Sequence, residues 1–295
     1  MRIGLVTPVL TLVPGAHGRW ERDAGLAEVV EIATTADRRG YDHLTCSEHV
    51  AVPADVAPTR GATYWDPLAT FGYLSARTSR VRLATSVLVL GYHHPLEIAK
   101  RYGTLDQISG GRLVLGLGVG SLRDEFELLG APFEGRGPIA DDALRALRAS
   151  LSQRTATYHG EHYDYDDLIV DPHAVQARVP IWIGGRTRRS LRRAIDLADG
   201  WMPFGLSAAE LGSWLREVDA PPGFDAVLAP TRALDPAAHP DRALEALGEL
   251  HDAGATIISA RIVAQSAAHY IEQLAALAEL AELPEAPTRP DPTDG

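Results

Sequence analysis

The stretch that decides the fold is residues 81–117, VRLATSVLVLGYHHPLEIAKRYGTLDQISGGRLVLGL. Aliphatic and β-branched residues at Val81–Leu88 and Leu113–Leu117 predict two buried strands, and the apolar spacing of Pro95–Ile108 predicts a helix between them. A proline suits the first turn of that helix, and Gly110-Gly111 suits its end. A strand, a helix and a second strand in this order predict one parallel βαβ unit.

The same unit recurs along the chain. The expected strands are Ile3–Thr7, His43–Ser47, Val81–Leu88, Leu113–Leu117, Pro180–Gly184, Gly200–Pro203, Asp225–Ala229 and Ile257–Val263. The expected helices are Asp23–Arg39, Asp66–Thr78, Pro95–Ile108, Ile139–Ser152, Arg188–Leu197, Ala208–Val218, Asp241–Asp252 and Ala267–Ala281. This alternation favours an α/β fold, a closed (β/α)8 TIM barrel with short insertions in a single domain. The alternative is an open doubly wound sheet, which usually has a glycine-rich turn after its first strand, whereas Thr7 and Pro8 lead into a long loop here.

Two segments fall outside this repeat. Residues Tyr158–Val170 indicate a small hairpin that turns at His159–Glu161 and is inserted before the fifth strand. The end of the chain, Pro284–Gly295, contains four prolines and several charges, which predicts disorder. We therefore expect a barrel domain over residues 1–283 and a disordered tail over residues 284–295.

Composition excludes several classes of protein. The chain has 295 residues, a formal net charge of −11, a single cysteine and a single lysine, Lys100. The charge argues against general nucleic-acid or membrane-surface binding, and the single cysteine argues against a disulfide framework or a cysteine-rich zinc site. No Walker motif surrounds Lys100. No apolar run is long enough for a membrane helix and no secretory signal pattern is present, so we expect a cytoplasmic protein.

In a barrel of this kind the active site lies at the C-terminal ends of the strands. After the fifth strand, Gly184-Gly185 lead into a helix that opens with Arg186–Arg189. Backbone N–H groups and the helix dipole at such a position favour a phosphate, and Arg186 adds positive charge. The alternative for the arginines is a solvated basic surface in which Arg192 pairs with Asp196.

Titratable residues follow the second strand. His49 is expected at the barrel mouth, where it could exchange a proton near neutral pH, and Glu48 could orient a ligand or accept a proton. The alternative is that Glu48 and His49 form a structural hydrogen-bonded cap. Cys46 is expected to be a small buried residue rather than a nucleophile. The adjacent side chains of His93-His94 should point apart on a turn, so no metal site is predicted.

Several motifs together resemble a known family. They are HP-x₃-AK at residues 94–100, L-D-x-I-S-G-G-R-L at 105–113, G-x-G-V-G at 116–120, and G-G with A-D-G-W at 184–201. As a set they resemble the luciferase-like superfamily of flavin- and deazaflavin-dependent oxidoreductases. The resemblance extends over about residues 1–203 and is vague beyond them.

The resemblance implies an eight-stranded barrel that holds a flavin or coenzyme F420 at the strand C-termini. It implies a bulge with a non-prolyl cis peptide in the third strand, against one face of the isoalloxazine ring. It also implies that His49 lies near the reactive ring carbon, as proton donor or substrate orienter. The expected catalytic residues are His49 and Glu48, and the expected cofactor-binding residues are Ser86, Val87, Gly118, Val119, Gly120, Ser121, Gly184, Gly185 and Arg186.

Two positions depart from the pattern of the family. Ser121 stands where many relatives have tryptophan, which leaves the substrate wall undefined. Some relatives use a glutamate of the fourth loop as proton acceptor. The residues available there are Arg123, Asp124 and Glu125, and none falls clearly on the matching position, so that role is not assigned.

The resemblance favours an F420-dependent oxidoreductase that moves a hydride between the cofactor and a small organic substrate. The alternative is an FMN-dependent two-component monooxygenase, which takes reduced flavin from a separate flavin reductase and uses O2. A non-catalytic cofactor-binding barrel is a third reading. Family members are often dimers, so a homodimer is expected, without nucleic-acid or membrane partners. The sequence specifies neither the substrate nor the direction of hydride transfer.

Overall fold

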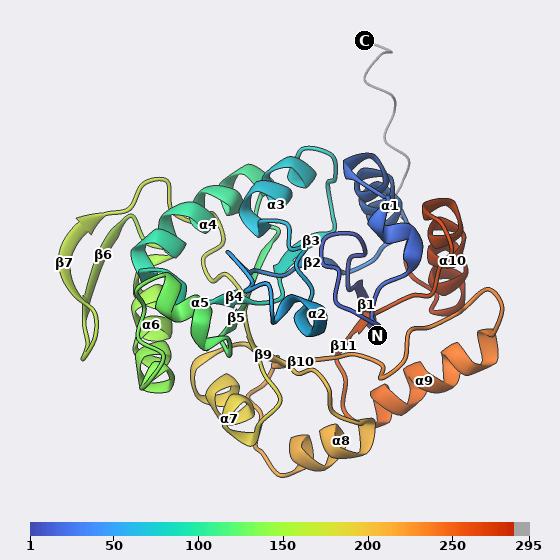
Figure 1. Cartoon of the computed structure of the whole chain (residues 1–295). Helices are drawn as coiled ribbons and strands as arrows, with labels where there is room; N and C mark the ends of the chain where they lie inside the picture. The colour runs from blue at the N-terminus through green and yellow to red at the C-terminus, as the bar shows by residue number, and fades with distance from the viewer. Residues whose placement is uncertain (286–295) are drawn as a thin grey trace.

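The computed structural model describes residues 1–285, and its centre is a closed barrel of parallel strands (Figure 1). The barrel strands are β1 (Arg2–Leu5), β2 (His43–Cys46), β3 (Arg82–Thr85) with β4 (Leu88–Val89), β5 (Leu113–Gly118), β8 (Ile181–Gly184), β9 (Gly200–Met202), β10 (Asp225–Leu228) and β11 (Ile257–Ala260). Strand β1 pairs with both β2 and β11, and β3 pairs with β5, so the sheet closes on itself. The predicted (β/α)8 barrel is confirmed, and each predicted strand overlaps one strand of the barrel.

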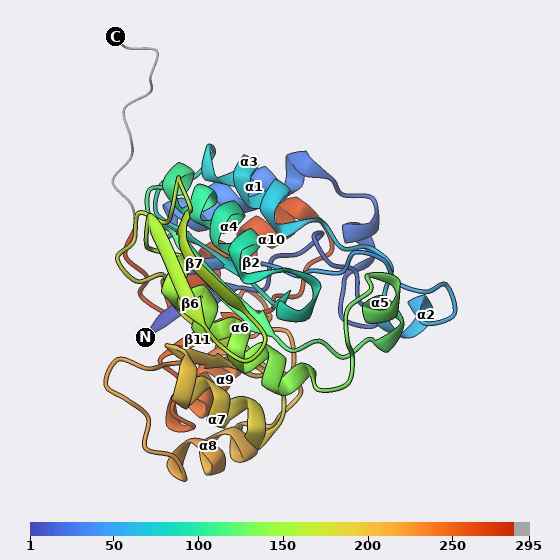
Figure 2. The same cartoon turned by 90° about the vertical axis from the view of Figure 1, so that its left-hand side faces the viewer.

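Helices form an outer ring around the strands. The ring consists of α1 (Leu26–Arg38), α3 (Pro67–Ser75), α4 (Pro95–Ser109), α6 (Arg136–Ser150), α7 (Arg188–Leu197), α8 (Ala208–Arg216), α9 (Pro240–Asp252) and α10 (Ala267–Leu280). Two short helices, α2 (Ala57–Arg60) and α5 (Arg123–Leu128), lie in the loops after β2 and β5. Figure 2 shows α2 and α5 on the side of the molecule away from the N-terminus. This is the face at which the parallel strands end, where barrel sites lie.

The third barrel strand is interrupted. Its predicted span, Val81–Leu88, divides into β3 and β4, and between them the peptide bond Ser86-Val87 is cis although no proline is present. Both pieces pair with β5, β3 through Leu83 and β4 through Leu88. The bulge with a non-prolyl cis peptide that the family resemblance implied is therefore present at the expected residues.

Apolar side chains fill the middle of the barrel. They form a buried cluster of Ala84, Val114, Trp182, Met202, Val227 and Ile257, with Val87 packed against it. Successive strand residues alternate between the inner and outer faces, and β3, β5, β8, β9, β10 and β11 each contribute one inward-facing residue to this cluster. A second, larger cluster lies between the outer faces of the strands and the helices. The barrel is thus a packed core that is closed beneath the mouth.

A polar network closes the opposite, N-terminal end of the barrel. Asp42 accepts hydrogen bonds from Arg82 (2.5 Å) and His43 Nδ1 (2.8 Å), and Arg2 bridges Asp42 and Asp225. The pKa of Asp42 is held well below its usual range, because these partners outweigh the effect of its burial. The network therefore depends on an ionised carboxylate at the bottom of the barrel.

The insertion before β8 is a two-stranded hairpin, as predicted. Strands β6 (Thr155–His159) and β7 (Asp164–Ile169) pair antiparallel, and Gly160 N–H donates to the carbonyl of Tyr163. The turn thus occupies residues 160–163, slightly later than the expected His159–Glu161. The predicted disordered tail, 284–295, falls mostly outside the described residues, which end at 285.

Candidate active site

The floor of the barrel mouth is formed by Val87, which sits between two glycines. A Cβ atom at Gly184 would lie 2.5 Å from Cγ1 of Val87, and one at Gly118 would lie 2.6 Å from its Cγ2. Neither strand can carry a larger residue here unless Val87 moves. Beside it, the carbonyl of Ser86 accepts a hydrogen bond from Ser47 Oγ at 2.8 Å. The space that these two glycines leave is therefore occupied by Val87.

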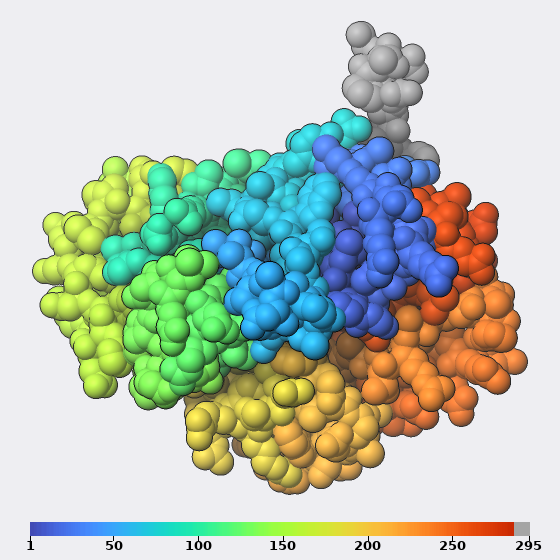
Figure 3. All heavy atoms as spheres, in the orientation of Figure 1, coloured from blue at the N-terminus to red at the C-terminus, as the bar shows by residue number. Residues whose placement is uncertain are grey.

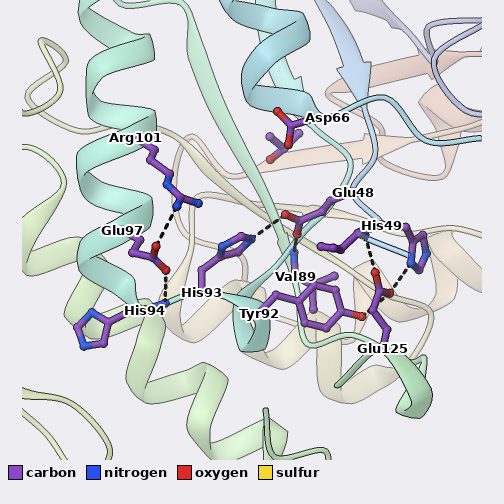
Figure 4. A network of polar contacts seen from close by, with 12 residues as sticks. Glu48, His49, Asp66, Val89, Tyr92, His93, His94, Glu97, Arg101 and Glu125 are labelled. Carbon is purple, nitrogen blue, oxygen red and sulfur yellow. Dashed lines mark hydrogen bonds and ion pairs between the residues drawn. The ribbon is translucent and has the colours of Figure 1, made fainter. Parts of the chain in front are cut away.

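His49 stands at the rim of the mouth and pairs with Glu125 of α5 (Figure 4). Its Nδ1 lies 2.6 Å from Oε2 of Glu125, and the ring of Tyr64 packs edge-on against it at 4.5 Å. An ionised carboxylate can only accept, so Nδ1 carries a proton and Nε2 is the ring atom left to exchange one. The His49 side chain is 17% exposed, which allows a ligand to reach it.

Glu125 is the most heavily bonded carboxylate near the mouth. Besides His49, it accepts hydrogen bonds from the N–H of Val50 (2.5 Å) and Ala51 (3.2 Å) and from the hydroxyl of Tyr92 (2.7 Å). Its side chain is fully buried. Burial alone would raise the pKa of this carboxyl, but the hydrogen bonds from Tyr92, His49 and Val50 bring it below its ordinary value. Glu125 is therefore a fixed negative charge that orients the imidazole.

Glu48 enters a different network from His49, although the two residues are adjacent in sequence. The Glu48 carboxylate accepts from the N–H of Val89 (2.7 Å) and pairs with Nε2 of His93 (2.7 Å), as Figure 4 shows. Its side chain is only 7% exposed. These contacts fasten the loop after β2 to β4 and η2 (Leu90–Tyr92). Glu48 is thus buried and bonded through both carboxylate oxygens, as expected for a structural role. His49 is partly exposed at the mouth, as expected for a reactive group.

The loop for which the sequence predicts phosphate binding follows β8. Gly184-Gly185 lead into α7, and Thr187 caps that helix by accepting a hydrogen bond from the N–H of Ser190 (3.2 Å). Within residues 1–285, the N–H groups of Arg188 and Arg189 have no acceptor. Free N–H groups at a helix start are suited to an anion.

The arginines of this loop differ in their partners. Arg188 pairs with Glu217 at the end of α8, and Arg193 pairs with Asp141 of α6. Arg186 is exposed and, in the part of the chain that the structure describes, has no carboxylate partner. Of these three arginines, Arg186 is the one available to a bound anion.

The loop after β5 carries the remaining predicted cofactor residues. Val119 is partly buried against the core, and the carbonyl of Gly120 accepts from Nε of Arg136 at 3.2 Å. Ser121 is exposed, and its hydroxyl accepts from Nη1 of Arg60 at 3.1 Å. This last contact joins the α5 loop to the α2 loop, and Figure 3 shows the two loops side by side on the mouth face.

A cavity of about 240 Å³ opens beside the mouth, between the ends of β1 and β11. Its walls come from the loop after β1, including Thr7 and Glu21, and from Arg261 and Tyr270 at the other end of the chain. The long loop after the first strand is evident in the sequence, but no role was predicted for Arg261 or Tyr270. The cavity lies beside the predicted site residues, none of which lines it.

Other residues that the sequence raised have structural roles. Cys46 is buried, and burial raises the pKa of its thiol to about 12, which fits the predicted inert residue. His94 caps α4 by accepting from the N–H of Leu96, while His93 pairs with Glu48. Among residues 1–285 no group of three or more metal-ligating side chains is arranged to hold an ion. No helix of that part of the chain is long and apolar enough to cross a membrane.

Glu125 is the functional residue that sequence reasoning left unassigned, and a signal for it exists. Leu122, Phe126 and Leu129 recur at helical spacing, and Glu125 lies on the face they define. Phe126 is fully buried, so this face turns inward. An acidic residue on the apolar face of a short helix indicates a buried partner, which here is His49.

Comparison with known proteins agrees with this barrel. The sequence matches the luciferase-like monooxygenase family over residues 1–280. An uncharacterized protein of Mycobacterium tuberculosis is 31% identical over 262 residues, which cover 83% of this chain and 91% of that protein. The F420-dependent glucose-6-phosphate dehydrogenase of Nakamurella multipartita is 31% identical over 183 residues, covering 60% of this chain and 52% of that one.

Among solved structures, a monooxygenase from Streptomyces bottropensis shares the fold with a TM-score of 0.72 at 20% identity, covering 95% of this chain and 98% of that one. The family match and the fold together place the chain among the enzymes of the barrel oxidoreductase and monooxygenase class. More particularly, the chain belongs to the luciferase-like monooxygenase family, and an F420-dependent dehydrogenase is among its relatives.

Proposed function

We propose that this protein is an F420-dependent oxidoreductase that transfers a hydride between the deazaflavin and a small organic substrate. The observation that carries the proposal is the His49–Glu125 pair, with Nδ1 held at 2.6 Å from the carboxylate and Nε2 left to the mouth. Hydride transfer to or from a carbon–oxygen bond must be matched by movement of one proton, and a positioned imidazole supplies it. The F420-dependent relative from Nakamurella multipartita supports the choice of cofactor.

The residues at the mouth suit a flat, anionic cofactor. Val87, held between Gly118 and Gly184, presents an apolar floor on which a ring system can lie. The free N–H groups at the start of α7 and the unpaired Arg186 suit a phosphate, against a net charge of −11 for the chain. When bound, coenzyme F420 supplies the carbon that gives or takes the hydride.

The side chains of this protein handle the proton and its surroundings. The negative charge of Glu125 keeps the proton of His49 on Nδ1 and stabilises the imidazolium when Nε2 takes a second proton. Tyr92 and the N–H groups of Val50 and Ala51 hold Glu125 in place. Glu48 fixes the β2 loop from the other side through His93, so we infer that it positions His49 and exchanges no proton itself.

An FMN-dependent two-component monooxygenase is the second candidate. The similarity in fold to a monooxygenase from Streptomyces bottropensis supports it. Such an enzyme would bind reduced FMN from a separate reductase and would need the α2 loop over the mouth to exclude water. The two candidates differ in whether the reaction consumes O2, which makes them separable by experiment.

Substituting His49 by alanine tests the proposed role of this residue. Protein loaded with F420 would be assayed for F420 oxidation or reduction against a panel of small alcohols, aldehydes and ketones without O2. We expect His49→Ala to lower turnover by roughly a hundredfold or more, while the Kd for F420 changes by less than about threefold. A variant whose F420 affinity collapses while its turnover survives would show that His49 binds the cofactor and does not move the proton.

A further inference from the structure

The cavity between the ends of β1 and β11 contains an arginine that the proposed reaction does not use. Residues on β11 alternate, and Ile257 belongs to the cluster inside the barrel while Ser259 contacts the inward-facing His43. Arg261, two residues further on, therefore continues the inward-facing row beyond the end of β11 and lines the cavity. Its guanidinium has no ion-pair partner among residues 1–285.

Glu21 and His17, which also line this cavity, are already engaged. The Glu21 carboxylate accepts from the N–H of Val9 (2.8 Å) and Gly18 (2.6 Å), which fixes it to the loop after β1. His17 donates from Nδ1 to the carbonyl of Val13 (2.7 Å), and its Nε2 accepts from Nε of Arg22 (3.1 Å). Arg261 is thus the one uncommitted charge in the cavity wall of the described chain.

A second observation concerns Tyr270 of α10. Tyr270 is 1% exposed, lines the same cavity, and its hydroxyl is buried without a hydrogen-bond partner in the described chain. That hydroxyl has almost no surface open to the recess, so Tyr270 contributes its ring to the cavity wall. The unpaired guanidinium of Arg261 is the group in the wall that is complementary to an oxygen-rich anion.

We propose that this cavity binds the anionic head group of the substrate, a carboxylate or a phosphate, through Arg261. The proposal rests on the proposed function, because it assigns a substrate class to that reaction. The volume of about 240 Å³ suits a small organic acid or a short phosphate ester. The alternative occupant of this cavity is an anionic group of the cofactor tail. The experiment below distinguishes that group from the substrate head group.

The position of the cavity fits this assignment. Strand β1 pairs with β2 on one side and β11 on the other, so the loops that carry His49 and Arg261 flank the end of β1. Thr11 of the cavity wall forms a backbone bridge with Tyr64, whose ring packs against His49 at 4.5 Å. The cavity and the loop that carries His49 are therefore neighbours at the mouth of the barrel.

The test is an anion titration by calorimetry on the full-length protein, with and without saturating F420. The probes are acetate and inorganic phosphate, with neutral acetamide as the uncharged match. The variants are Arg261→Gln, Tyr270→Phe and the control Arg77→Gln, which removes an exposed arginine between α3 and β3, at the N-terminal face. We expect at least one anion to bind the wild-type and Arg77→Gln proteins with a Kd in the millimolar range, and acetamide not to bind.

In Arg261→Gln the Kd for the bound anion should rise at least about tenfold. In Tyr270→Phe it should change by less than about threefold, because that hydroxyl is not open to the recess. The Kd for F420 should stay the same in both variants. Equal anion binding by wild type and Arg261→Gln would overturn the proposal. A parallel loss of F420 affinity in Arg261→Gln would also overturn it, because the anion would then belong to the cofactor. Failure of the wild type to bind F420, with anion binding intact, would instead contradict the proposed function.

Discussion

At the scale of single residues, hydrogen-bond partners decide which of two neighbouring titratable groups can take part in chemistry. Glu48 and His49 follow one another in sequence, but Glu48 is bonded to Val89 and His93, whereas His49 is held by Glu125. Because strand and loop residues alternate in direction, adjacent side chains enter different surroundings. The carboxylate that orients the His49 imidazole belongs to Glu125 and therefore comes from α5, 76 positions further along the chain.

A consequence is that Glu125 should stabilise the fold as well as orient His49. Replacing it by glutamine leaves an amide facing four donors, which should lower the free energy of unfolding by about 1–3 kcal/mol near neutral pH. The pKa of Glu125 is lowered in the folded state, so its contribution is present above the unfolded pKa and is lost as the pH falls through the folded one. The difference between wild type and Glu125→Gln should therefore shrink below about pH 4.

Urea unfolding near neutral pH and again below about pH 4 measures this difference in the free energy of unfolding. Glu127→Gln is the matched control, since Glu127 lies on the same helix and is 64% exposed, and its stability should stay within about 0.5 kcal/mol of wild type. A stability gap for Glu125→Gln that persists unchanged in acid would show that the carboxylate charge is not what the site uses.

At the scale of elements, the mouth depends on the fit between the bulge of the third strand and the strands beside it. Val87 follows the cis peptide and fills the space that Gly118 of β5 and Gly184 of β8 leave open. The sequence predicts that Gly184 binds phosphate. The close approach of Val87 is a separate, packing reason for a glycine at this position. The amides that remain free lie further on, at the start of α7.

A double substitution tests this packing. Gly184→Ala should destabilise the protein by about 1–3 kcal/mol, because its Cβ would overlap Cγ1 of Val87. Adding Val87→Ala removes that atom and leaves the nearest contact at 3.7 Å, so the pair should recover most of the loss. The control is Gly248→Ala within α9, where nothing lies within 4 Å and the free energy of unfolding should rise by about 0.5–1 kcal/mol. Additive effects of the two substitutions in chemical denaturation would refute the proposed contact.

At the scale of the whole molecule, the two ends of the barrel have separate tasks. The N-terminal end is closed by Arg2, Asp42, Arg82 and Asp225, and the C-terminal end carries the site. We expect Asp42→Asn to lower the free energy of unfolding by roughly 1–3 kcal/mol, because it removes the buried, charged acceptor of Arg82 and His43. The Kd for F420 should remain unchanged in the same variant. A loss of cofactor affinity that exceeds the fraction of unfolded protein would contradict this division.

The barrel itself could be predicted from sequence because it rests on local signals. Strand runs such as Leu113–Leu117 and helix limits such as Pro95 and Gly110 appear in the structure within a few residues of their expected places. The contacts that build the site could not be predicted in this way, because they join loops distant in sequence. The His49–Glu125 pair spans 76 positions, and the cavity combines the loop after β1 with Arg261. The cis peptide at Ser86-Val87 was expected only through family resemblance.

The measurement that tests the central claim most directly is a fluorescence titration of the purified protein with F420 and, separately, with oxidised and reduced FMN. We predict micromolar binding of F420 and much weaker binding of either form of FMN, with F420 affinity reduced at least about tenfold in Arg186→Gln. Preference for reduced FMN would contradict the account and identify the protein as an oxygen-dependent monooxygenase. Binding of neither cofactor would contradict the assignment of the α7 start and the Val87 floor as a cofactor site.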